Sequence, residues 1–213
     1  PADFSRLAEL FPTVSFEWLP TDNVDYGAIG GMVQHITVAT MDRLLLPDLL
    51  PEVQRVIHHD LDAVCLADLA DLDAVDLGGH PIAAVTSPRA RYRSGLGGFR
   101  GTAHRLRNEG LPDRARELIQ RTHLRHGHDF DSFNAGLMVL DLERMRADGF
   151  CGEFFPYAER FGLNDQAVLN AYAGSDRLDL DRSWNWCPRL EDMTDPRIAH
   201  WSGPVKPWGN GWV

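Results

Sequence analysis

The sequence lacks the cysteine pairs typical of disulfide- or zinc-stabilised proteins and the long apolar runs typical of membrane-spanning proteins. Its three cysteines, Cys65, Cys151 and Cys187, are far apart and form no C-x-x-C pair. This spacing argues against a disulfide framework and against a zinc ribbon, and it favours reduced thiols in a reducing compartment. No apolar run reaches the roughly 18 residues that a membrane-spanning helix requires, so the sequence predicts no transmembrane segment.

The chain also lacks an excess of positive charge. Its formal net charge is −10, and its isoelectric point is about 5.3. Because a phosphate backbone requires a basic protein surface, we expect no nucleic-acid partner. An anionic ligand would then need local compensation, either from a metal ion or from a few placed lysine and arginine side chains.

The residues that are present indicate a single α/β domain. The 213 residues, 44% of them hydrophobic, are enough for one buried core, and helical and extended patterns alternate along them. Helices are predicted over 4–10, 40–50, 112–125 and 164–172, and strands over 14–19, 53–66, 81–86, 133–142 and 197–201. Residues 89–107, rich in Gly, Arg and Ser, are predicted to be irregular. The alternation favours a mostly parallel sheet with ligand groups at the carboxyl ends of its strands.

Two carboxylates, Asp60 and Asp62, interrupt the most apolar extended stretch of the chain. The D-x-D pattern is weak alone, because it also occurs at 71–73, 129–131 and 179–181, and most such triplets are solvated turns. Burying two carboxylates costs several kcal/mol unless a cation compensates them. The setting therefore favours a divalent cation at 60–62, whereas 71–73 is expected at the solvated start of a helix.

A second group of candidate ligands follows the last predicted strand. His200 ends that strand, and Gly203 and Lys206 come shortly after it. Glycine lets backbone amides approach a phosphate, and lysine adds a compact positive charge. One histidine among carboxylates suits Mn²⁺ better than Ca²⁺. A lone histidine is more often structural, and that alternative stays open.

Five blocks of sequence, in order, cover nearly the whole chain. They are residues 40–44 with the Asp60–Asp62 strand, residues 66–77, Phe-Asn-Ala-Gly at 133–136, Asn-Asp-Gln-x-x-Leu-Asn at 164–170, and His-Trp-x-Gly-x-x-Lys-Pro-Trp at 200–208. Together they resemble glycosyltransferase family 8, the family of glycogenin and of bacterial lipopolysaccharide galactosyl- and glucosyltransferases. Each block is a weak signal, but their common order and spacing make the resemblance specific.

The resemblance implies a single-domain nucleotide-diphospho-sugar transferase fold, Rossmann-like and of the GT-A type, with a mostly parallel mixed sheet. It implies three ligands for Mn²⁺, with Mg²⁺ as an alternative: Asp60, Asp62 and His200. It assigns Gly203 and Lys206 to the diphosphate. It assigns to the donor-sugar pocket Arg43, Asn134, Ala135, Gly136, Asp165 and Gln166. From the residues alone, Asn134 and Gly136 could equally mark a bulge, and Asp165 could be only a helix cap.

The activity implied is transfer of a hexose, glucose or galactose, from a UDP-sugar to a saccharide, glycolipid or protein hydroxyl, with retention of configuration. Double displacement needs a carboxylate beneath the sugar, but Gln166 stands there with Asp165 beside it, so we favour front-face attack. Two alternatives are a sugar-nucleotide hydrolase and a catalytically incompetent sugar-nucleotide-binding fragment. We expect a cytoplasmic protein, with peripheral contact to the inner face of the membrane left open.

The chain departs from the family pattern in two places. His58 and His59 stand where the family has apolar or tyrosine residues. The family also opens with a strand, a helix and a second strand, whereas this chain opens on a predicted helix. We therefore interpret residues 1–213 as a catalytic domain that is incomplete at its N-terminus by about 40–50 residues, the size of one βαβ unit.

Overall fold

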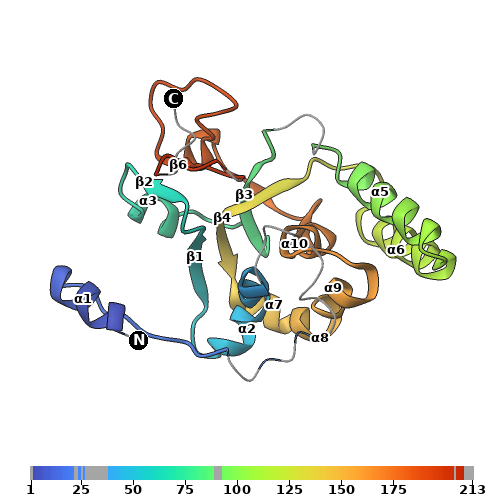
Figure 1. Cartoon of the computed structure of the whole chain (residues 1–213), viewed down its shortest axis with the longest axis horizontal. Helices are drawn as coiled ribbons and strands as arrows, with labels where there is room; N and C mark the ends of the chain where they lie inside the picture. The colour runs from blue at the N-terminus through green and yellow to red at the C-terminus, as the bar shows by residue number, and fades with distance from the viewer. Residues whose placement is uncertain are drawn as a thin grey trace.

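The computed structural model describes residues 2–21, 24, 26, 38–88, 93–203 and 205–208. These residues form an α/β domain with two sheets (Figure 1). The larger sheet has the strand order β1-β4-β3-β5, with bounds Arg55–His59, Phe133–Asp141, Ile82–Thr86 and Leu178–Asp179. The smaller sheet pairs β2 (Ala63–Cys65) with β6 (Ile198–His200). The α/β class and the mixed sheet that the sequence predicted are thus confirmed.

The strand directions correct one expectation, because the described sheet is not mostly parallel. Strand β4 runs antiparallel to both β1 and β3, and only β3 and β5 pair in parallel. The cause is the connection from β3 to β4. It contains two helices, α5 (Gly95–Asn108) and α6 (Pro112–His126), which pack against each other beyond the end of the sheet (Figure 1). This helical pair returns the chain to the same end of the sheet at which β3 finishes, so β4 runs antiparallel to β3.

The core lies on both faces of the sheet, as alternating side chains require. On β3, Ile82 and Ala84 belong to one cluster of buried residues, and Ala83 and Val85 belong to the other. The first face is covered mainly by helices. They are η2 (Val38–Leu45), α2 (Leu46–Leu49), α7 (Leu142–Ala147), α8 (Phe150–Phe154), α9 (Pro156–Phe161) and α10 (Asp165–Ala173), and residues of α5 and α6 extend the same cluster beyond the sheet. The second face is covered by α3 (Ala70–Asp73), η3 (Arg182–Asn185) and the small sheet.

Strand β4 changes faces partway along its length. Phe133 and Ala135 lie in the helix-covered cluster, but Leu137, also an odd-numbered residue, lies in the opposite one. The pairing with β3 shows the same irregularity, since Ala84 pairs with Met138 and Thr86 pairs with Phe133. Extra residues in one strand form a bulge that redirects side chains. The bulge that the sequence left open at residues 134–136 is therefore present.

Most elements predicted from the sequence are confirmed, including α1 (Ala2–Leu10), η2 with α2, β1, β3, α6, β4, α10 and β6. The strand predicted at 14–19 is wrong. Those residues form no strand, and Val14 and Trp18 are 50% and 58% exposed. Strand propensity needs a partner strand to take effect, and no described strand pairs with these residues. In the described part of the chain, no helix is both long and apolar enough to cross a bilayer.

The irregular segment predicted at 89–107 is also wrong, because α5 occupies most of it. The four glycines of this segment disfavour a helix, but the burial of one apolar helix face stabilises it. Its buried residues lie at helical spacing: Leu96, Phe99, Ala103 and Leu106. The Ser94 side chain caps the helix by accepting a hydrogen bond of 2.8 Å from the Gly97 N–H.

We predict opposite effects for two Gly→Ala substitutions in α5. A Cβ at Gly98 would meet nothing within 4 Å, so Gly98→Ala should raise the free energy of unfolding by about 0.5–1 kcal/mol through helix propensity. A Cβ at Gly95 would lie 2.2 Å from the Phe130 ring. The Gly174 backbone also lies close to this ring, so the ring has little room to move. Gly95→Ala should therefore lower the free energy of unfolding by about 1–3 kcal/mol. Urea unfolding measures both, and equal effects would refute this account of the helix.

We predict that His126 makes the fold sensitive to mild acid. Its Nε2–H donates to Ala171 O at 3.0 Å, and its Nδ1 accepts from the Ser175 hydroxyl at 2.7 Å. Burial lowers its pKa from 6.5 to about 4, so between these values the unfolded chain binds a proton that the folded chain refuses. Stability should therefore fall as the pH drops from 6.5 toward 4, by about 1.4 kcal/mol per pH unit for this group. Urea titrations at several pH values measure how the free energy of unfolding depends on pH. His126→Gln should remove the contribution of one proton from that dependence, and an unchanged dependence would contradict the assignment.

Candidate active site

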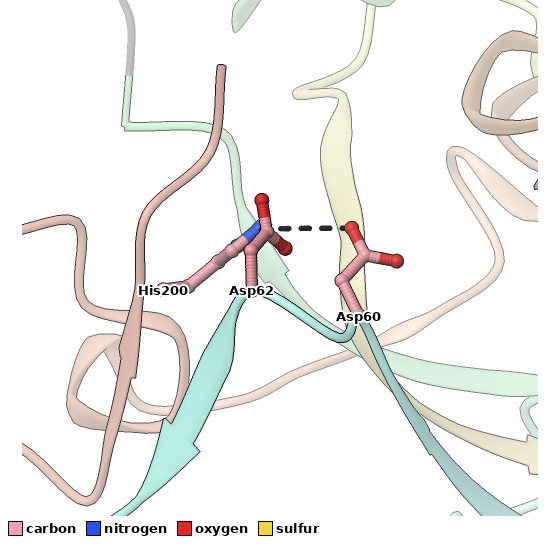
Figure 2. A group of neighbouring side chains, drawn as sticks. All are labelled: Asp60, Asp62 and His200. Carbon is pink, nitrogen blue, oxygen red and sulfur yellow. Dashed lines mark ion pairs between the residues drawn. The ribbon is translucent and has the colours of Figure 1, made fainter. Parts of the chain in front are cut away.

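Three side chains that the sequence singled out converge where the two sheets meet. Asp60 follows β1, Asp62 precedes β2, and His200 ends β6 and points toward the two carboxylates (Figure 2). Each offers a ligand atom within 4.8 Å of the other two. His200 Nε2 lies 3.6 Å from Asp60 Oδ2 and 3.3 Å from Asp62 Oδ1. Residues 140 positions apart in sequence thus form one cluster.

Backbone pairing sets this geometry. The Asp60 N–H donates to Gly136 O at 2.9 Å, which continues the β1–β4 ladder past the end of β1. The Trp201 N–H donates to Asp62 O at 3.0 Å, which continues the β2–β6 ladder past His200. The intervening Leu61 is 98% exposed at the turn, so both flanking carboxylates can face inward.

The donor set fits a divalent cation that accepts both oxygen and nitrogen ligands. Two carboxylates and one imidazole suit Mn²⁺ better than Ca²⁺, and both acids are only partly buried, so ligand and solvent oxygens could complete the shell. Aspartates of the other three D-x-D triplets have local roles instead. Asp71 pairs with Arg197 on the surface, Asp129 accepts from the Leu96 N–H at the start of α5, and Asp181 caps η3.

Each carboxylate of the acidic pair contacts its own cationic side chain. Arg43 contacts Asp60 Oδ1 at 2.7 Å through NH2, and it contacts Asp165 Oδ2 and Ala135 O at 3.1 Å each through NH1. Lys206, the only lysine in the chain, contacts Asp62 and donates to Trp201 O at 2.9 Å. Burial raises the pKa of Asp62, but the neighbouring His200 and Lys206 side chains outweigh this effect and hold the pKa at about 2. Asp62 is therefore ionised at neutral pH and ready to bind a cation.

The start of α10 supplies the next group of predicted residues. The Asn164 side chain, not Asp165, caps the helix by accepting from the Ala167 N–H at 2.9 Å. Asp165 is thereby left to face Arg43, and burial raises its pKa while Arg43 opposes the rise. Gln166 Oε1 accepts from Asn134 Nδ2 at 3.2 Å and from the Ala135 N–H at 3.1 Å. The helix start and the β4 bulge are therefore directly joined.

Glycine is required at one position in this cluster. A Cβ at Gly136 would lie 2.1 Å from His200 Cε1 and 2.8 Å from Asn134 Oδ1, so any other residue would occupy the place of the imidazole. The remaining predicted residue, Gly203, has a φ of 103°, which lets the chain turn between His200 and Lys206.

Two residues near the site carried no functional prediction. Asn185, at the end of η3, is buried and contacts both His200 and Asn134. It lies 15 residues from His200 with no spacing pattern to mark it, so only the fold reveals it. His58, noted only as a departure from the family pattern, lies beside Arg43 and Asp60. Burial, reinforced by Arg43, lowers its pKa to about 4, which keeps the ring neutral.

Comparison with known proteins finds similar sequences. The model of the family described as glycosyl transferase family 8 matches residues 32–211. General stress protein A of Bacillus subtilis is 24% identical over 201 residues, which cover 83% of this chain and 61% of that protein. Glycosyltransferase GlyF of Streptococcus pneumoniae is 24% identical over 190 residues, 82% of this chain and 38% of that protein. This chain thus spans less than two thirds of either relative's length.

A solved structure confirms the fold. The galactosyltransferase LgtC, determined in complex with donor and acceptor sugar analogs, matches with a TM-score of 0.62 at 18% identity. The match covers 84% of this chain and 63% of that chain. At this level of identity the likeness establishes the GT-A type fold that the sequence resemblance implied.

We predict that Gly136→Ala weakens binding of Mn²⁺ without unfolding the protein. The added methyl would displace the His200 ring, and loss of one protein ligand should weaken affinity at least about tenfold. Electron paramagnetic resonance of free Mn²⁺ measures the affinity. Gly152→Ala in α8 is the matched control, because a Cβ there meets nothing within 4 Å. Equal affinities for the two variants would contradict the inferred crowding.

Proposed function

This chain belongs to glycosyl transferase family 8, and on that premise we propose that it transfers a hexose, glucose or galactose, from a UDP-sugar to a hydroxyl acceptor with retention of configuration. One observation carries the proposal. In the Asp60–Asp62–His200 cluster, Asp62 contacts Lys206, and Asp60 contacts Arg43, which also pairs with Asp165, the neighbour of Gln166 in the chain. A metal site that adjoins both a cationic and an amide-rich region suits a sugar diphosphate.

Departure of the nucleoside diphosphate is the demanding step, because one further negative charge develops on its terminal phosphate as the bond to the sugar breaks. A Mn²⁺ ion, or Mg²⁺ in its place, bound by Asp60, Asp62 and His200 would supply Lewis-acid stabilisation of that charge. Lys206 is placed to assist, because its ammonium already neutralises Asp62 and could turn to a phosphate oxygen when the cation takes over that carboxylate. The positive φ at Gly203 supports a close approach of the backbone to the diphosphate.

The sugar would lie toward Arg43 and the start of α10. Arg43 is nearly buried, and its Nε has no hydrogen-bond partner in the part of the chain that the structure describes, so a sugar hydroxyl is a reasonable acceptor for it. Gln166 Oε1 already accepts two hydrogen bonds from the β4 bulge, and Asp165 is held by Arg43. Neither group is free to attack the anomeric carbon, and this supports front-face attack over double displacement.

The acceptor and the compartment are further parts of the proposal. The acceptor class is a saccharide, a glycolipid or a protein hydroxyl. All three cysteines are free, which supports a reducing compartment, and we propose the cytoplasm. Contact with the inner face of the membrane would follow if the acceptor is a glycolipid.

We predict that Asp60→Asn, Asp62→Asn and His200→Ala each reduce Mn²⁺-dependent transfer by at least about 10²-fold. Each change removes a ligand to the charge that stabilises the leaving group. Release of UDP by the full-length protein, with UDP-glucose and UDP-galactose and with saccharide acceptors, measures the effect. The same assay without an acceptor tests hydrolysis.

Asp71→Asn and Asp73→Asn on α3 are the matched controls, because they change the same D-x-D pattern away from the cluster. They should leave the rate near that of the unchanged protein. Equal losses at both triplets, or UDP release that is independent of divalent cations, would overturn the proposed role of the cluster.

A further inference from the structure

A row of side-chain amides connects the start of α10 to the imidazole of His200. Gln166 Oε1 accepts from Asn134 Nδ2 at 3.2 Å, and Asn134 Oδ1 accepts from Asn185 Nδ2 at 2.9 Å. Asn185 Oδ1 lies 2.8 Å from His200 Nδ1. Three elements, α10, β4 and η3, each contribute one amide to this row.

Two backbone N–H groups determine which way the amides point. A backbone N–H can only donate, so each must face an oxygen. The Ala135 N–H faces the Gln166 side chain at 3.1 Å, and the Gly136 N–H faces the Asn134 side chain at 2.9 Å. The oxygens of Gln166 and Asn134 are thereby fixed. If either amide flipped, its NH₂ group would face a backbone N–H, and two donors would stand opposite each other.

The orientation of Asn185 and the proton on His200 follow from these anchors. The Asn134 oxygen requires a donor, so Asn185 must present its NH₂ to Asn134 and its oxygen to His200. An oxygen 2.8 Å from Nδ1 requires that Nδ1 carries the proton. We infer that Asn185 is a positioning residue that holds neutral His200 as the Nδ1–H tautomer, with its bare Nε2 directed at Asp60 and Asp62.

The opposite tautomer, with the proton on Nε2, would be favoured by the nearby carboxylates. Two carboxylates face Nε2, and a proton there could bond to either of them. The distances of 3.3 and 3.6 Å exceed the roughly 2.7–2.9 Å of a charge-assisted hydrogen bond, so that alternative is poorly formed. Asn185 and His200 are only 4% and 3% exposed, so water cannot readily replace the Asn185 contact. Without Asn185, the ring would instead place its proton between the carboxylates.

The consequence for metal binding rests on the proposed function, whereas the tautomer does not. A metal ion requires the lone pair of Nε2, and a partner that holds the other ring nitrogen preserves that lone pair and the ring orientation. The row also joins Gln166 to His200, so the donor-sugar region and the metal ligand share one hydrogen-bonded framework.

The direct test uses ¹⁵N-histidine NMR of the full-length, metal-free protein at about pH 9, where an ordinary imidazole is neutral. The His200 signals are assigned by their loss in His200→Gln. We expect Nδ1 to be protonated and Nε2 to be bare. A predominantly Nε2–H ring in the unchanged protein overturns the inference whether or not any variant folds.

Two variants extend the test. Asn185→Leu removes the acceptor at similar size and should shift His200 toward the Nε2–H tautomer. Asn185→Asp retains an acceptor for Nδ1–H and should keep the original tautomer. Ser183→Ala in the same short helix is the control, because the Ser183 side chain bonds Asp181 and not His200.

Binding of Mn²⁺ alone, followed by calorimetry, separates this inference from the proposed function. We expect Asn185→Leu to raise the Kd for Mn²⁺ about 10–100-fold, with Asn185→Asp binding at least as tightly as the unchanged protein. Equal affinities for Asn185→Leu and Ser183→Ala overturn the positioning role. Failure of the unchanged protein to bind Mn²⁺ overturns the proposed metal site instead, while the tautomer measurement still decides the inference.

Discussion

The half-buried carboxylate pair Asp60 and Asp62 is the constraint on which the rest of the site depends. Two acids at the junction of two sheets repel each other and lose part of their hydration, so the fold must bring positive or polar groups to them. It does so from distant parts of the chain: Arg43 from η2, His200 from β6, and Lys206 from the segment beyond it. These contacts tie the smaller sheet to the larger one. A divalent cation would supply the remaining compensation, so the geometry that stabilises the fold is also the geometry that a cation requires.

The bulge in β4 is the second structural requirement. It interrupts the regular alternation at residues 134–136, so the Asn134 side chain contacts Gln166 and Asn185 and also accepts from the Gly136 N–H. A regular strand would pair every backbone N–H with its neighbour, whereas the bulge leaves the N–H groups of Ala135 and Gly136 to side-chain oxygens. Because a backbone donor cannot change roles, these two bonds organise the amides around them. The missing side chain at Gly136 then leaves the space that His200 fills.

Rigidity of this kind has a chemical use. Arg43, Asp165 and Gln166 are each held by neighbours. In the proposed function these preorganised polar groups would stabilise developing charge without the cost of reorienting. The same packing leads us to expect that the network tolerates little substitution. Asp165, Asn185 and His200 are buried, so an unpaired group among them would lose its water as well as its partner.

The sequence by itself determined the local elements and the identity of the cluster. Apolar periodicity located most helices and strands, and the apolar setting of Asp60 and Asp62 distinguished them from the three other D-x-D triplets. It could not determine strand direction, the helix α5 or the failure of residues 14–19 to form a strand, because these depend on which partners pack against a segment. It also could not identify Asn185, whose spacing carries no period. Only the tertiary structure decided those points, because hydrogen bonds between residues far apart in sequence exist only once the strands have been brought together.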